Sequence, residues 1–275
     1  MNLHDYDTFS AELQATLEQD SRVLGLVAAG SMANTNHAPD AYSDHDFWII
    51  TRPGAQEHFR TTYDWLPYHE RIILAFRETE HGLKLFFDFG HLVEYAVFAP
   101  EELSVTRLNS YRVLIDRERI AERLQEVLER TAQESAAEQD NSTFLFGQFL
   151  TNLWVGVGRH RRGEWLSGHQ FVRHSALNHL LPLLKRWVPA QRPDRLDNID
   201  HTRRFEQAYP ALGQDLRRAL LLDTPEAADA LLTLAAVELG RTWPDYPTEA
   251  VHCVAHHLLQ TDDSPPPVES IEWPI

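Results

Sequence analysis

The segment from Gly25 to Thr51 constrains this chain more than any other part of it. It reads GLVAAGSMANTNHAPDAYSDHDFWIIT, in which two apolar runs enclose the small pair Gly30-Ser31, a polar loop and the triplet Asp44-His45-Asp46. The apolar runs predict two buried strands. Because side chains alternate along a strand, Asp44 and Asp46 are expected to point the same way and to bind one divalent cation together. The alternative is that both acids are solvated turn residues ahead of a strand.

The small pair Gly30-Ser31 follows the first apolar run directly. A small pair at the end of a strand leaves backbone N–H groups open to a ligand, and a helix that starts there would add the positive end of its dipole. We therefore expect Gly30 and Ser31 to hold a phosphate group. A phosphate holder, a spacer and a metal-binding pair together predict a site for nucleotide chemistry. The alternative is that Gly30 is an ordinary bend.

This arrangement resembles the signature of the DNA-polymerase-β-like nucleotidyltransferases. In those proteins an apolar residue and Gly-Ser or Gly-Gly precede a spacer and then Asp-x-Asp with apolar residues after it. Here the pattern is Ala29-Gly30-Ser31, then residues 32 to 43, then Asp44-His45-Asp46-Phe47. His45 departs from the pattern, since an apolar residue is common between the two acids. The departure removes no metal ligand.

The resemblance implies a third carboxylate on a neighbouring strand, where it would bind a second metal ion or take a proton. Glu94 in the run HLVEYAVF fits this role, because an acid inside an apolar strand is costly unless a metal or hydrogen bonds compensate it. Asp88 is the rival, but it lies beside the tight turn at Gly90. The alternative for Glu94 is an outward-facing side chain on an edge strand.

Length, charge and cysteine content limit the class of protein. A chain of 275 residues suggests two domains, and 43% hydrophobic with 24% charged residues is typical of a soluble globular protein. A net charge of −16, carried mostly before residue 140, argues against a nucleic-acid partner and favours small or cationic acceptors. The single cysteine, the acidic N-terminus and the lack of a long apolar run predict a cytoplasmic protein with no membrane segment.

The pattern along the chain predicts an α+β domain followed by an all-α domain. After a first amphipathic helix, the runs VLGLVAA, FWIIT, RIILAF, LKLFFDF and HLVEYAVF predict a mixed sheet of about five strands with flanking helices, to which residues 112 to 115 add an edge strand. Pro53 is expected to open a helix that ends near Pro67. The polar stretch SAAEQDNS, residues 135 to 142, is expected to separate a catalytic domain, 1–138, from a helical domain, 139–275. The Pro-rich acidic segment 261–275 is expected to be an extended tail.

The helical half carries a local basic cluster that needs a counter-charge. Between Asp140 and Asp194 Glu164 is the one acid, whereas basic residues are frequent. A nucleoside triphosphate at Gly30-Ser31 would supply that charge, with guanidinium groups closing on its phosphates. The residues assigned to this clamp are Arg159, Arg162 and Arg173. The alternative is a solvated helix end whose basic residues meet the helix dipole.

The segment GRHRRGEW, 158 to 165, is similar to the segment between helices in the helical domains of antibiotic nucleotidyltransferases. This similarity implies that Glu164 faces the acceptor and activates its hydroxyl. An ion pair between Glu164 and a neighbouring arginine is the alternative.

The overall layout resembles the bacterial enzymes that inactivate lincosamide or aminoglycoside antibiotics by nucleotidylation, with the lincosamide group favoured through SDHDF and GHLVEYAVF. The resemblance implies two Mg²⁺ ions held by Asp44, Asp46 and Glu94, a nucleoside triphosphate as co-substrate, a small-molecule acceptor and a homodimer. A protein or tRNA acceptor, as in toxin-antitoxin relatives of this superfamily, stays open. So does a catalytically silent nucleotide-binding module.

Overall fold

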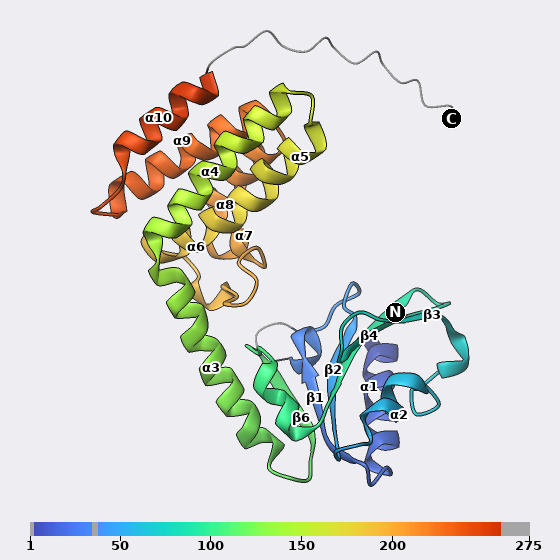
Figure 1. Ribbon diagram of the computed structural model, residues 1–275. Coiled ribbons are helices and arrows are strands. Elements are labelled where there is room, and N and C mark those ends of the chain that lie inside the picture. Colours follow the sequence, from blue (N-terminus) through green and yellow to red (C-terminus); the bar gives the residue numbers. More distant parts are fainter. Residues whose placement is uncertain (1–2, 35–37, 260–275) are drawn as a thin grey trace, which may run out of the picture. The chain divides into compact units, whose positions relative to one another are not determined.

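The computed structural model describes residues 3–34 and 38–259, and the chain divides into two compact units, Met1–Glu134 and Ser135–Ile275. The N-terminal unit contains a mixed sheet and the C-terminal unit is helical (Figure 1). The expected α+β and all-α organisation is therefore present. The expected domain limits, 1–138 and 139–275, stay a prediction.

The sheet has six strands rather than the five expected, in the order β3-β4-β5-β2-β1-β6. The sixth is the segment expected as an added edge strand, and it pairs antiparallel with β1. The pair β2 and β5 is parallel, and the other neighbours are antiparallel. The strands are β1 Val23–Ala29, β2 His45–Thr51, β3 Ile72–Arg77, β4 Gly82–Phe87, β5 His91–Phe98 and β6 Tyr111–Asp116.

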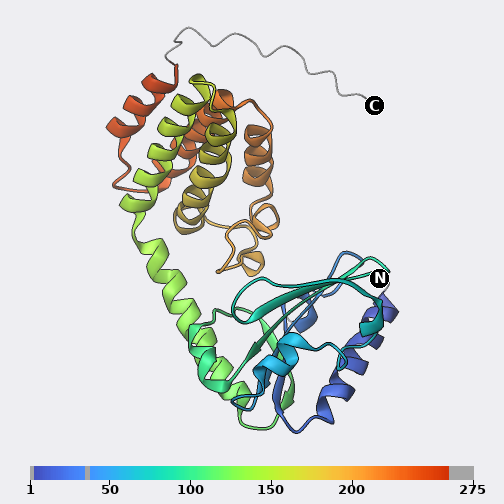
Figure 2. The same ribbon diagram turned by 45° about the vertical axis from the view of Figure 1, so that its right-hand side comes forward.

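One face of the sheet packs against α1, Leu3–Glu18, and α2, Gln56–Thr61 (Figures 1 and 2). Phe9, Leu13 and Leu17 recur every four residues, so α1 presents one apolar stripe to the sheet, and all three side chains are fully buried. The other face packs in part against α3, Ile120–Asp140, whose Ile120, Leu124 and Val127 join strand residues in a second core. The two cores lie on opposite faces because strand side chains alternate.

One expected helix in the N-terminal half was wrong. Residues 53 to 67 do not form one helix: α2 ends at Thr61, and the Trp65 indole N–H then donates to the Thr62 carbonyl at 2.8 Å, which holds the chain in a turn. The polar stretch 135 to 142 begins where the two compact units divide, and its residues 135 to 140 form the end of α3. This segment is rich in Ala, Glu and Gln, which are strong helix formers, so propensity continues the helix through the polar composition.

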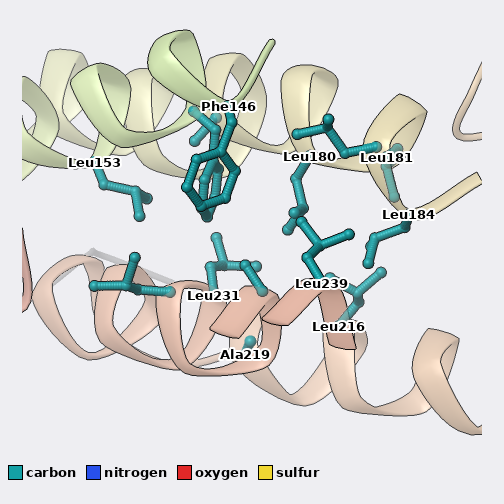
Figure 3. Close-up of a cluster of buried hydrophobic side chains, with 14 of the residues drawn as sticks. Phe146, Leu153, Leu180, Leu181, Leu184, Leu216, Ala219, Leu231 and Leu239 are labelled. Carbon is teal, nitrogen blue, oxygen red and sulfur yellow. The ribbon is translucent and has the colours of Figure 1, made fainter. Parts of the chain in front are cut away.

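The C-terminal unit is a helical array with its own apolar core. Figure 3 shows side chains of α4, α6, α8 and α9 meeting in this core, among them Phe146, Leu180 and Leu231. Across residues 3–34 and 38–259, no helix is both long enough and apolar enough to pass through a bilayer. The elements are α4 Ser142–Arg161, α5 Trp165–Gln170, a π-helical turn Phe171–Ala176, α6 Leu177–Trp187, α7 Phe205–Ala208, α8 Pro210–Leu220, α9 Thr224–Thr242 and α10 Thr248–Leu259.

A buried polar chain joins α1 to the starts of β2 and β5. His45 is fully buried, its Nδ1 lies 2.7 Å from His91 Nε2, and its Nε2 lies 2.9 Å from Ser10 Oγ. Ser10 Oγ in turn donates to the Tyr6 carbonyl at 3.1 Å. Two neutral rings satisfy all of these contacts if His91 Nε2 donates to His45 Nδ1 and His45 Nε2 donates to Ser10 Oγ. Burial favours the neutral form, and it lowers the pKa of His45 to about 3 and that of His91 to about 4.

This burial predicts a dependence of stability on pH. The unfolded chain takes up a proton at His91 below a pKa of about 6.5, whereas the folded state takes it up only near the lowered value. The free energy of unfolding should therefore fall as the pH drops from about 6.5 towards about 4, by up to about 1.4 kcal/mol per pH unit for each such histidine. We expect His91→Phe to reduce this slope in urea denaturation of the full chain at pH 7, 6 and 5.

The control is His69→Phe, which changes an exposed histidine of the same unit. It should leave the slope as in the unsubstituted protein. Parallel pH dependences for His91→Phe and the unsubstituted protein would contradict the role given to His91.

Candidate functional site

Asp44 and Asp46 flank the start of β2, as the strand alternation predicts. His45 points into the core between α1 and the sheet, so Asp46, the next residue of the strand, is directed away from that core. Asp44 immediately precedes the strand, and both acids are partly buried. The Tyr6 hydroxyl donates to the Asp44 carbonyl at 2.9 Å, and the Tyr6 ring stacks on His45 at 3.8 Å between centroids. These contacts with α1 fix the backbone from which the two carboxylates project.

The turn at Gly30 lies against Asp46. Gly30 follows β1, which pairs with β2, and its φ of +50° is in the left-handed region that favours glycine. A Cβ at this position would lie 3.2 Å from Asp46 Oδ2. The two halves of the sequence motif therefore meet in one place, and glycine is what allows the backbone to approach the carboxylate so closely.

The helix expected after Gly30-Ser31 is only a 3₁₀ turn, Gly30–Ala33. It ends at Asn34, whose left-handed conformation lets its N–H donate to the Ser31 carbonyl at 3.0 Å. A single turn has no helix dipole of useful size, so the expectation of a dipole contribution was wrong. Any anion held here would depend on backbone N–H groups and on the Ser31 hydroxyl.

Tyr6 connects the two halves of the site. Its hydroxyl, which bonds the Asp44 carbonyl, also forms a hydrogen bond with the Ser31 side chain. Burial raises the pKa of Tyr6 well above its ordinary value, the nearby charges of Asp44 and Asp46 raise it further, and the Ser31 hydrogen bond opposes them. Tyr6 is therefore a neutral donor at this site. Tyr6 was not among the residues predicted from the sequence, because it precedes Ala29 by more than twenty residues.

Glu94 lies on the strand next to Asp46, with the two residues as direct partners in the parallel ladder. Its strand β5 is central and not at an edge, and its side chain is 33% exposed. The burial cost that the sequence analysis invoked is therefore small, because Lys84 Nζ lies 3.2 Å from Glu94 Oε1 and the carboxylate keeps access to water. Within 3–34 and 38–259, no three acidic, histidine or cysteine side chains converge closely enough to hold a metal ion.

Two cations of the N-terminal unit were not predicted from the sequence: one contacts Glu94, and the other contacts the 3₁₀ turn. Lys84 on β4 contacts both Glu94 and Glu78, and these contacts raise its pKa. Arg112 on β6 donates to the Met32 carbonyl of the 3₁₀ turn at 3.2 Å. Neither residue belongs to a recognisable motif, and only the pairing of β4 with β5 and of β6 with β1 brings them to the site.

Asp44 and Asp46 fit the demands of Mg²⁺. The ion prefers oxygen ligands, binds through one or two carboxylates, and completes its coordination with water and substrate phosphates. The third expected ligand, Glu94, is engaged by Lys84. Asp44 and Asp46 are therefore of the right chemical type for such an ion, and both expected ions stay a prediction.

The arginines expected to clamp a triphosphate have partners inside the C-terminal unit. Arg159 contacts Ser167 and lies over the Phe171 ring, with 4.5 Å from its guanidinium carbon to the ring centroid. Arg173 contacts His169 and donates to the Leu222 carbonyl. Binding of a triphosphate by these arginines stays a prediction. The phosphates would have to compete with the contacts that the arginines already make.

Glu164 has a local partner as well. Its carboxylate lies 3.0 Å from the Arg162 guanidinium, which is the ion pair weighed against an acceptor-activating role. Both side chains are well exposed, so the pair contributes little to stability and leaves Glu164 accessible. The role in acceptor activation stays a prediction.

A cavity of about 600 Å³ lies in the C-terminal unit among α6, α7 and α8. Its wall is mainly apolar, and Glu206 and Arg217 add one charge of each sign. This volume is in the range of small-molecule sites. None of the residues predicted from the sequence lines it.

No protein-family model matches the chain, and no curated protein matches it. Among solved structures, the chain is similar to an aminoglycoside 6-adenyltransferase from Bacillus subtilis, with a TM-score of 0.33 and 11% sequence identity. The match covers 91% of this chain and 97% of that one. A likeness this remote says nothing about the site, whose description depends on this chain's own residues.

The contact between Gly30 and Asp46 predicts the effect of a substitution. Gly30→Ala should lose about 1 kcal/mol of stability from its left-handed backbone, and its methyl group should also displace the Asp46 carboxylate. We expect weaker Mn²⁺ binding by calorimetry in addition to a lower midpoint of urea denaturation.

Gly54→Ala is the matched control, because Gly54 has a φ of +87° but no atom within 4 Å of an added Cβ. It should lose similar stability and keep its Mn²⁺ affinity. Equal Mn²⁺ affinity in both variants would show that Gly30 does not shape the cation site.

Proposed function

We propose that this protein transfers a nucleoside monophosphate from a nucleoside triphosphate to a hydroxyl group of a small molecule, with Mg²⁺ as the cation. The observation that carries the proposal is the proximity of the Gly30 turn to Asp46: a Cβ added at Gly30 would lie only 3.2 Å from Asp46 Oδ2, so a turn suited to hold phosphate adjoins a pair suited to bind a cation. Each half alone is common. Nucleotidyl transfer requires both together, and here one lies at the end of β1 and the other at the start of the adjacent strand β2.

In this proposal the chain's own groups divide the work. Backbone N–H groups at Gly30 and the Ser31 hydroxyl hold the outer phosphates. Tyr6 holds Ser31 and the Asp44 backbone close together through its hydrogen bonds to both. Asp44 and Asp46 hold the cation. Mg²⁺ bound there would neutralise charge on the triphosphate and orient it.

The transfer itself needs little covalent chemistry from the protein. The acceptor hydroxyl would attack the α-phosphorus in line, a new P–O bond would form, and the bond to pyrophosphate would break. The hydroxyl proton would pass to a base, a role for which the sequence offers two candidates, Glu94 and Glu164. The remaining task is positioning and charge stabilisation, as in phosphoryl transfer generally.

For the acceptor we propose an antibiotic, with a lincosamide favoured over an aminoglycoside. This choice is supported by the similarity of SDHDF and GHLVEYAVF to the lincosamide nucleotidyltransferases. The net charge of −16 is consistent with a small or cationic acceptor.

The proposal predicts the outcome of one substitution. Asp46→Asn should keep the fold, because the side chain changes by one atom, and should reduce transfer at least about 100-fold, because the cation loses an anionic ligand. The assay combines purified protein, Mg²⁺, each of four labelled nucleoside triphosphates and a panel of lincosamides and aminoglycosides. The readout is a mass increase of one nucleotide on the drug.

Asp64→Asn is the control, since it makes the same chemical change at an exposed position of the same unit, outside the site. It should leave transfer unchanged. Full activity in Asp46→Asn would refute the assignment. Nucleotide binding without transfer to any drug would keep the site and redirect the search to protein or RNA acceptors.

A further inference from the structure

The ion pair between Lys84 and Glu94 separates the third acid of the site from the other two. Lys84 Nζ lies 3.2 Å from Glu94 Oε1 and 3.0 Å from Glu78 Oε1, so one ammonium group bridges two carboxylates. Glu94, which was expected to bind a metal ion, is therefore already paired with a positively charged side chain of the protein itself.

Sheet register places these groups in one row. Lys84 on β4 is the direct partner of Glu94 on β5, and Glu94 is the direct partner of Asp46 on β2. Side chains at paired positions project from the same face, and neighbouring strands lie about 4.8 Å apart, so Lys84 is about 10 Å from Asp46 along the backbone row. The flexible four-carbon stem of lysine can shorten that distance considerably.

The ion pairs of Lys84 with Glu94 and Glu78 are weak enough to be replaced by contacts with a ligand. The side chains of Lys84 and Glu94 are 26% and 33% exposed, and that of Glu78 is 49% exposed, so water screens both ion pairs. Ion pairs that water screens in this way contribute little to stability. A triphosphate offers several charged oxygens, and ammonium-to-phosphate hydrogen bonds are among the stronger ones in proteins.

We propose that Lys84 is a substrate-responsive lock on Glu94. In the free protein Lys84 holds Glu94 in an ion pair. When a triphosphate binds at Gly30-Ser31, Lys84 moves to its phosphates, and Glu94 becomes available to the cation held by Asp44 and Asp46. Glu78 is left to water at the surface. The inference deepens the proposed function and depends on it.

A lock differs from a purely structural ion pair in the sign of two binding effects. Removing a lock should strengthen binding of the cation alone, because Glu94 is released, and should weaken binding of the nucleotide, because a phosphate contact is lost. Removing a structural pair should weaken both, because the site is disordered.

The experiment measures both affinities by calorimetry on the full chain. The probes are Mn²⁺ alone and, with Mg²⁺ present, the non-transferable α,β-methylene analogues of the four nucleoside triphosphates. For Lys84→Met we expect the Mn²⁺ affinity to rise and the analogue affinity to fall, each by about tenfold. Lys84→Arg keeps the charge, so both affinities should stay within about threefold of the unsubstituted protein.

Two controls isolate the lock. Arg71→Met removes one positive charge from an exposed ion pair with Asp88 in the same unit, and it should change neither affinity if the effect at Lys84 is local. Glu78→Gln removes the other partner of Lys84 and leaves the pair with Glu94, so the Mn²⁺ affinity should stay unchanged.

The outcomes separate this inference from the proposed function. If the unsubstituted protein binds none of the analogues, the proposed function fails and the lock fails with it. If it binds an analogue but Lys84→Met changes neither affinity, or lowers both, the lock alone is refuted. A change in Arg71→Met equal to that in Lys84→Met would refute it too, since the effect would then be one of net charge.

Discussion

The burial of His45 is the constraint on which the site depends. Strand alternation sends His45 to one face of β2 and its two neighbours to the other, and the hydrogen bonds of His45 to Ser10 and His91 hold that alternation in place. A shift of β2 by one residue would bring a carboxylate into an apolar core and expose a ring that stacks on Tyr6. The burial of His45 therefore serves both the packing of the core and the placement of the neighbouring carboxylates.

Charge at the site is balanced by close neighbours. The N-terminal unit carries most of the chain's acidic surplus, yet Lys84 and Arg112 lie where the sheet brings the acids and the 3₁₀ turn together. Lys84 reduces the repulsion between Glu94 and Glu78, because its ammonium group lies within 3.2 Å of both carboxylates.

The two units differ in how their charged residues are engaged. In the N-terminal unit the groups of the site come from α1, the 3₁₀ turn, β2, β4, β5 and β6, and all of them are described within one compact body. In the C-terminal unit the arginines of the basic cluster contact carbonyls, a hydroxyl and a ring of their own surroundings. The residues proposed to bind a cation and a phosphate group therefore make their described contacts within the N-terminal unit.

The sequence alone determined the local features: a strand that orients Asp44 and Asp46 alike, a small pair after the preceding strand, a sheet followed by helices. These follow from periods of two and of about four residues, which are properties of the backbone. Tertiary structure decided the rest. The contact of Gly30 with Asp46, the Tyr6 link between Ser31 and Asp44, and the capture of Glu94 by Lys84 all depend on which strands become neighbours and in what register. Strand order is set by packing between residues far apart in the chain, so no local pattern could reveal that Glu94 forms an ion pair with Lys84.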